Sequence, residues 1–109
     1  MNNWSPGRDL TKLSYTEKHI GIIAGRASRA FLEYAPLRIS PDDSERVYRK
    51  IPYGPLLDVF VIDMRSYRGP NTHNRQAAED PDTVYLGKPQ LEWLVNGLAA
   101  SKAAWKIIA

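Results

Sequence analysis

Residues 56–68 read Leu56-Leu57-Asp58-Val59-Phe60-Val61-Ile62-Asp63-Met64-Arg65-Ser66-Tyr67-Arg68. The nearly unbroken apolar part of this run predicts a buried strand over residues 56–62. An acid and two arginines follow the strand. Open α/β sheets build sites for anionic ligands from charged residues at the carboxyl ends of buried strands. The stretch therefore favours an α/β fold with a site that handles phosphate.

A loop and a helix are expected ahead of this strand. Residues 2–13 are polar and are expected to form a loop. A helix is predicted over residues 17–34, with Ser14 or Thr16 as its cap and Pro36 ending it. Its apolar side chains recur at three- and four-residue steps and form one stripe: Ile20, Ile23, Ala24, Ala27, Phe31 and Tyr34.

Turn signals place the strand in a hairpin. Residues 46–51 alternate apolar and polar side chains, which predicts a half-exposed strand. Residues 52–55 read Pro-Tyr-Gly-Pro, a strong turn signal. An antiparallel pairing with the strand over residues 56–62 follows. Residues 69–82 are polar and exceed the usual connection of about 4–6 residues, so a functional loop or an insertion is expected there.

A second helix and a third strand complete the pattern. The run Gly87-Lys88-Pro89 opens the helix, because proline is tolerated in a first turn. Residues 105–109 read as a strand, so strand, helix and strand form a crossover unit with parallel strands. Trp93 and Trp105 are expected to pack in the core or the crossover. The apolar stripe of the helix is expected to be Leu91, Leu94, Val95 and Leu98.

Length and composition restrict the classes of protein. At 109 residues the chain is at most one small domain, and its 43% hydrophobic content permits a core. The net charge of +3 is compatible with nucleic acid or phosphorylated substrates. With no cysteine there is no disulfide framework and no thiolate metal site. No apolar run approaches the ~20 residues needed to span a bilayer.

Four segments follow one another in a distinctive order. Residues 30–38 carry an aromatic-acid-aromatic-x-Pro-x-Arg segment, and residues 47–54 a Tyr-Arg, aromatic-Gly hairpin. Residues 61–68 hold Asp-x-Arg-x-Tyr-Arg, and residues 86–94 hold Leu-Gly-x-x-Gln-x-x-Trp-Leu. This ordered set resembles the alkaline phosphatase D (PhoD-like) family of metallophosphatases. The resemblance covers essentially the whole chain from Asn2 onward.

The resemblance implies a partial metallo-dependent phosphatase sandwich. That fold has two mixed sheets flanked by helices, and residues 1–109 would be a central segment, incomplete at both ends. The family's acidic and histidine-containing metal motif would precede Asn2-Asn3-Trp4, and its Asp-x-His motif would lie beyond Ala109. We therefore expect an internal piece of a larger catalytic domain, inactive alone, whose partners are the missing parts of that domain.

The resemblance also implies chemistry. It implies hydrolysis of phosphomonoesters or phosphodiesters at a metal cluster, with calcium and iron as the expected ions. The parent protein would be exported to the periplasm or the cell exterior. Asn2 and Asn3 would be metal ligands, because a carboxamide oxygen suits hard cations. The alternative for both is an unstructured terminus.

The candidate site residues follow the buried strand. Arg65 is predicted to bind substrate and stabilise charge on the phosphoryl group, because its planar fork matches phosphate oxygens. The alternative is a salt bridge with Asp63 or another acid. Asp63 is a candidate catalytic residue that orients Arg65 or a metal ligand, or else a strand-end cap. Arg68 is predicted to bind substrate by adding positive potential, or else to be a solvated loop arginine, while Tyr67 is expected to pack.

The sequence also allows a function other than catalysis. A non-catalytic remnant or a small basic binding module is the alternative function. The lysines do not cluster with Trp93 and Trp105 in any nucleic-acid motif, which disfavours a base-stacking platform. His19 is expected to be structural or solvated. A loop cluster could bind a cation, although a hydrated loop is the favoured interpretation: Asn71, His73, Asn74, Glu79, Asp80 and Asp82.

Overall fold

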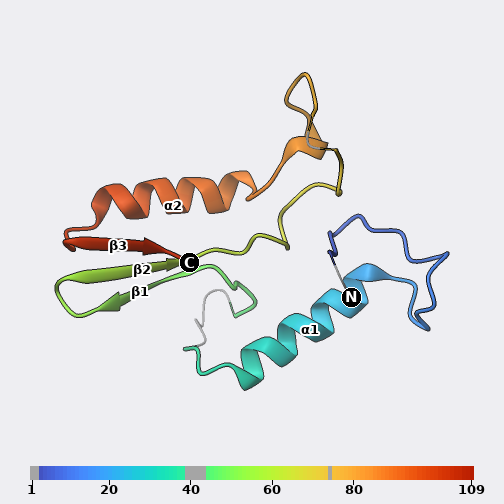
Figure 1. Cartoon of the computed structure of the whole chain (residues 1–109). Coiled ribbons are helices and arrows are strands. Elements are labelled where there is room, and N and C mark those ends of the chain that lie inside the picture. The colour runs from blue at the N-terminus through green and yellow to red at the C-terminus, as the bar shows by residue number, and fades with distance from the viewer. Residues whose placement is uncertain (1–2, 39–43, 74) are drawn as a thin grey trace.

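The computed structural model describes residues 3–38, 44–73 and 75–109. Figure 1 shows a mixed α/β arrangement, which confirms the predicted class. The described residues form one three-stranded sheet, so the second sheet of the expected sandwich stays a prediction. The elements are α1 (Ile20–Tyr34), β1 (Arg49–Tyr53), β2 (Leu57–Val61), the short 3-10 helix η1 (Pro81–Thr83), α2 (Lys88–Ala100) and β3 (Trp105–Ile108).

Both predicted strand pairings are confirmed. β1 pairs antiparallel with β2, and β2 pairs parallel with β3 across the α2 crossover. The predicted turn at residues 52–55 is wrong by two residues, because Pro52 pairs with Asp58 inside the ladder. An edge strand tolerates the missing N–H of proline. The turn occupies residues 54–56, where Gly54 adopts a φ of +70° that most side chains disfavour.

α2 covers one face of the sheet. Phe60 is fully buried, and its ring lies 5.9 Å from the ring of Trp93, which confirms that this tryptophan packs. Leu91 and Val95 were expected to be buried but are about half exposed, at 50% and 55%. The helix turns Gln90 toward the sheet instead, because the Gln90 amide bonds to the backbone where β2 ends. The spacing of apolar residues alone does not predict that a polar side chain such as Gln90 is buried.

The buried acid Asp58 also joins the hairpin to the crossover. Asp58 is buried and accepts hydrogen bonds from Lys50 Nζ, at 2.7 Å, and from the hydroxyl of Ser101, just after α2. These donors favour the charged carboxylate, so Lys50 first and Ser101 second hold the pKa of Asp58 below its ordinary value. The hairpin and the crossover are therefore tied together at one acid.

α1 is shorter at its start than the periodicity predicts. His19 is the N-cap, and its N–H donates to Glu17 Oε1 at 2.7 Å, so the predicted caps at Ser14 or Thr16 are wrong. The C-terminal prediction is confirmed, because Ala35, just before the proline, is extended. Leu32 is the buried residue of the helix. Most of the predicted apolar stripe lies along a cavity rather than in a packed core.

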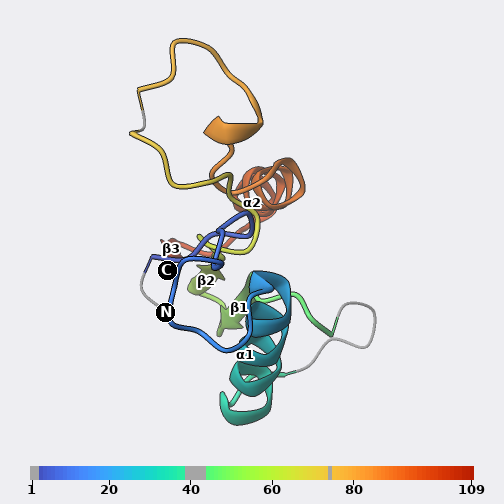
Figure 2. The ribbon, with the colours of Figure 1, turned by 90° about the vertical axis from the view of Figure 1, so that its right-hand side faces the viewer.

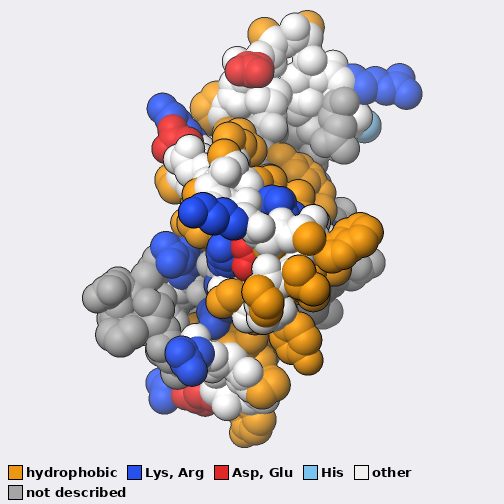
Figure 3. Space-filling model, turned by 90° about the vertical axis from the view of Figure 1, so that its left-hand side faces the viewer, with side chains coloured by type: hydrophobic (Ala, Val, Ile, Leu, Met, Phe, Trp, Pro, Cys, Tyr) orange, Lys and Arg blue, Asp and Glu red, His pale blue; other side chains and the backbone are white. Residues whose placement is uncertain are grey.

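The molecule is open rather than tightly packed. In two perpendicular views the strands lie between α2 and α1 (Figures 1 and 2). The radius of gyration is 16.3 Å, against about 13 Å for a compact chain of about 100 residues. Hydrophobic side chains gather at the hairpin-turn end of the sheet (Figure 3), where Tyr53, Leu56 and Trp105 are exposed.

Two further sequence predictions can be compared with the structure. The prediction that Trp105 packs is wrong, because its side chain is 72% exposed on β3, an edge strand of the described sheet. Neither helix in the described part of the chain has the length and apolar content needed to cross a membrane.

Candidate functional site

The chain turns sharply where β2 ends. The side-chain oxygen Oδ1 of Asp63 accepts hydrogen bonds from the backbone N–H groups of Arg65 and Ser66, both at 2.9 Å. Asp63 is 8% exposed, so these bonds satisfy backbone donors in a buried place. The structure thus shows the strand-end cap that the sequence left open as one reading of Asp63.

Gln90 fixes this turn from α2. Its Oε1 accepts from the backbone N–H of Asp63 at 2.7 Å, and its Nε2 donates to the carbonyl of Asp63 at 2.9 Å. The same Nε2 donates to the carbonyl of Leu86 at 2.8 Å. Gln90 is fully buried. The helix therefore holds the residue from which the Arg65 turn starts.

Arg65 meets the N-terminal segment. Its Nη1 donates to Oδ1 of Asn3 at 2.7 Å and to the carbonyl of Trp4 at 3.3 Å. The fold thus brings together a predicted phosphate-binding residue and a predicted metal ligand that lie 62 positions apart. Among residues 3–38, 44–73 and 75–109, no carboxylate forms an ion pair with Arg65. Its charge is therefore not neutralised by Asp63.

Asn3 is itself held in place by two side chains whose role the sequence did not reveal. Arg8 Nη1 donates to the Asn3 carbonyl at 2.9 Å, and Asn71 Nδ2 donates to the same carbonyl at 2.7 Å. Asn3 has a φ of +49°, a left-handed conformation that asparagine tolerates better than most residues. Bonds from distant side chains to a backbone carbonyl leave no signal in the sequence.

Arg68 occupies a different environment. Its guanidinium lies over the ring of Tyr85, with 5.1 Å between them, and its Nε is buried. That Nε has no hydrogen-bond partner among the residues the structure describes. The reading of Arg68 as a solvated loop arginine is therefore wrong. Tyr67 packs edge-on against Tyr48, with ring centroids 5.6 Å apart, which confirms its expected packing role.

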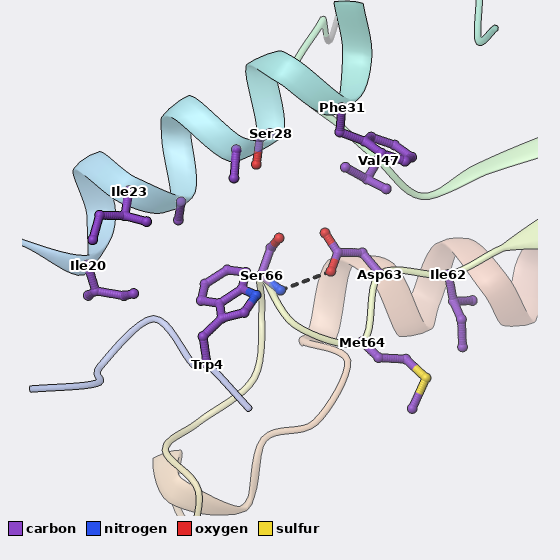
Figure 4. A pocket seen from close by; sticks show the side chains of 12 residues that line it. Trp4, Ile20, Ile23, Ser28, Phe31, Val47, Ile62, Asp63, Met64 and Ser66 are labelled. Atoms are coloured by element: carbon purple, nitrogen blue, oxygen red, sulfur yellow. Dashed lines mark hydrogen bonds between the residues drawn. The ribbon is translucent and has the colours of Figure 1, made fainter. Parts of the chain in front are cut away.

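An apolar cavity flanks the turn. It measures about 420 Å³ and lies between α1 and the chain that follows β2 (Figure 4). Ile20, Ile23 and Phe31 reach it from the helix, and Trp4 enters from the N-terminal segment. The capped Asp63 side chain stands on its wall. The turn that carries Arg65 thus has an apolar surface on one side.

Comparisons with known proteins identify the family of the chain. Residues 1–109 match the sequence model of the PhoD-like phosphatase family. The chain belongs to this family. It is 36% identical over 92 residues to alkaline phosphatase D of Bacillus subtilis (strain 168), a match that covers 76% of the chain and 16% of that protein. The family resemblance predicted from the sequence is confirmed.

The fold agrees as well. A solved structure described as "Structure of PhoD" is similar with a TM-score of 0.66 and 28% sequence identity. The match covers 98% of this chain and 22% of that one. The PhoD-like chain described above therefore spans about a sixth of its curated relative and about a fifth of the solved structure.

The described part of this PhoD-like chain does not fit a calcium or iron site on its own. It contains no group of three or more His, Asp or Glu side chains able to hold a metal ion. Asn2 lies outside the described residues, as does Asn74 of the predicted loop cluster. Asp80 accepts from the N–H groups of η1 instead of facing a cation. The Asn3 oxygen already faces the Arg65 guanidinium at 2.7 Å, and a cation there would meet a like charge.

Proposed function

We propose that this chain is the phosphate-binding segment of a PhoD-like phosphoesterase domain, and that Arg65 binds the phosphoryl oxygens of a phosphate monoester or diester. One observation carries the proposal. Arg65 is held by the neutral oxygens of Asn3 and Trp4, and no carboxylate in the part of the chain that the structure describes pairs with it. Its full positive charge is therefore available to an anion.

The remaining donors suit a phosphate. The side-chain hydrogen bonds of Arg65 to described residues all use Nη1. Nε and Nη2 form the other edge of the planar fork, which matches two phosphoryl oxygens. Asp63 supports this arrangement by capping the turn, while Arg68 adds positive potential from its place over Tyr85.

Binding is not hydrolysis. Attack on a phosphate ester needs an activated nucleophile, and the described residues hold no group of three or more His, Asp or Glu side chains that could bind a metal ion to activate water. We propose that other parts of the domain supply this group together with any calcium or iron site, in a parent protein exported to the periplasm or the cell exterior. The isolated chain is then expected to bind phosphate weakly and to be inactive as a hydrolase.

A phosphate titration tests the binding role. In spectra of the ¹⁵N-labelled chain, inorganic phosphate is expected to shift the backbone N–H resonances of residues 65 and 66 with a dissociation constant of about 1–10 mM. Arg65→Lys keeps the charge but removes the fork, so binding is expected to weaken roughly tenfold. Arg29→Lys is the matched control, because Arg29 is 81% exposed and pairs with Glu33 on α1. If neither variant weakens binding, the chain attracts phosphate by its net charge alone, because both substitutions keep that charge.

A hydrolysis assay tests the inactivity. The chain is mixed with bis(4-nitrophenyl) phosphate, with and without added calcium and iron(III). We expect no release of nitrophenol above the buffer rate in either case. Release that depends on the protein, and that Arg65→Lys reduces, would show that residues 1–109 carry a complete catalytic centre.

A further inference from the structure

The Asn3 residue is the centre of a small network. Its side-chain oxygen accepts from Arg65, while its backbone carbonyl accepts from both Arg8 and Asn71. These three donors come from the turn after β2, the N-terminal loop and the long loop after Arg68. Segments far apart in the sequence thus meet at one asparagine beside the proposed phosphate site.

We propose that Asn71 and Arg8 are positioning residues: they fix the backbone of Asn3 so that its side chain aims the Arg65 guanidinium at the substrate phosphate. The inference rests on the phosphate-binding role proposed for Arg65. It adds that the orientation of Arg65 is set by a donor on the loop after the Asp-x-Arg-x-Tyr-Arg segment, and that Asn3 serves Arg65 rather than a metal.

The backbone of Asn3 needs such support. Asn3 is exposed and has a φ of +49°, a sparsely populated region for residues other than glycine. A carbonyl oxygen has two lone pairs, and the two donors at 2.9 and 2.7 Å occupy both. The next residues are anchored as well, because Ser5 and Leu10 are buried at 2% and 0% exposure. Asn3 is therefore held both at its carbonyl and through the anchored residues that follow it.

Arg65 depends on this support. An arginine side chain has several rotatable bonds, and an anion bound to a freely moving guanidinium must pay for ordering it. A hydrogen bond from Nη1 to a fixed acceptor restricts the head group before the anion arrives. Loss of Asn71 removes one donor from the support and leaves the acceptor Oδ1 in place. The effect on phosphate affinity should therefore be moderate rather than complete.

The test uses the ¹⁵N-labelled full chain and the variant Asn71→Ala, with Asn96→Ala on the exposed face of α2 as the control. Two quantities are measured: the rotation rate about the Cζ–Nη1 bond of Arg65 without phosphate, and the dissociation constant for inorganic phosphate. Asn71→Ala is expected to raise both, the second by about two- to tenfold, which is the usual range for one hydrogen bond. Asn71→Ser, which restores a donor, is expected to recover part of the loss.

A second variant tests the contact between Asn3 and Arg65. In Asn3→Asp the new carboxylate would pair with Arg65 and compete with the anion, so phosphate binding is expected to fall. Unchanged phosphate binding by Asn3→Asp would overturn the assignment, because the side chain at position 3 would then not act on Arg65. Asn71→Ala behaving like Asn96→Ala in both measurements would overturn it too.

The result also distinguishes this inference from the proposed function. If phosphate leaves the Arg65 resonance unchanged in the native chain, the phosphate-binding role fails. Faster rotation in Asn71→Ala would still support the positioning of Arg65 by Asn71. If phosphate binds but Asn71→Ala changes neither quantity, the positioning role fails alone.

Discussion

The substitution Gln90→Met is the sharpest test of how the fold presents Arg65. Methionine keeps the length of the side chain and loses the amide. Gln90 is fully buried and makes three hydrogen bonds of 2.7 to 2.9 Å with the backbone of Asp63 and Leu86. The variant therefore leaves one N–H and two carbonyl groups without their partner, at the point where the Arg65 turn begins.

The expected loss can be worked from these contacts. A buried backbone group left without a partner costs about 1–3 kcal/mol. The Asp63 groups are buried, while the Leu86 carbonyl lies at a half-buried residue and can be partly hydrated. We therefore expect the free energy of unfolding to fall by about 3–5 kcal/mol for Gln90→Met. Since small domains are stable by only about 5–15 kcal/mol, this is a large fraction of the total.

Urea denaturation measures this loss. Trp93 lies 4.9 Å from Tyr48 and 5.9 Å from Phe60, ring to ring, so its fluorescence reports the packing of α2 on the sheet. With a slope of about 1–3 kcal/mol/M, the midpoint should fall by roughly 2 M. Gln76→Met is the control: Gln76 is half-buried in the long loop and donates to Thr72, so less than about 1 kcal/mol should be lost. Equal shifts for the two variants would refute the structural role of Gln90.

Three further outcomes are expected. Gly97→Ala should destabilise the chain by about 1–3 kcal/mol, because the added Cβ would lie 2.8 Å from the buried ring of Phe60. Gly21→Ala has open space around the added Cβ and should stabilise α1 by roughly 0.5–1 kcal/mol. Thermal unfolding of the two variants measures both changes. The pKa of Asp58 lies below its ordinary 3.8, so the ionised carboxylate should stabilise the fold above about pH 4. This stabilisation should be lost as the pH falls through the lower folded pKa. Urea midpoints measured from pH 6 to pH 2.5 should show the loss, and the Asp58→Asn variant should not show this dependence on pH. Asp63→Asn keeps an acceptor for the turn and should retain phosphate binding, whereas Asp63→Ala should weaken it; equal loss in both would show that the charge of Asp63 matters, not the cap.

Sequence reasoning predicted the connections of the sheet well and its details less well. The apolar run of β2, the turn signals before it and the proline at the start of α2 are local features, and they predicted the hairpin and the parallel crossover. The exact turn depended on whether Pro52 or Gly54 dominated, which the edge position of β1 decided. The face of α2 depended on Gln90, a polar residue buried by bonds to a distant backbone.

The candidate site was also predictable only where it depends on local sequence features. Arg65 could be proposed from its place after a buried strand, and the family could be recognised from ordered motifs. The contact between Arg65 and Asn3 joins residues 62 positions apart, and it depends on how two loops fold back. Asn71 belonged to a polar loop cluster considered for a cation, yet its side chain donates a hydrogen bond to Asn3. A donor bound to a carbonyl cannot be distinguished in sequence from a potential ligand.

The roles of Asp63 and Arg65 depend on each other. If Asp63 had paired with Arg65, an incoming phosphate would have to displace a carboxylate, and the net charge at the end of β2 would be close to zero. Asp63 instead accepts from two backbone N–H groups, one of them that of Arg65 itself. The same carboxylate that shapes the turn is thereby kept away from the guanidinium. Neutral oxygens of Asn3 and Trp4 hold the arginine, and no carboxylate among the described residues pairs with it, so a free positive charge stands just after β2, as the proposed binding of phosphate requires.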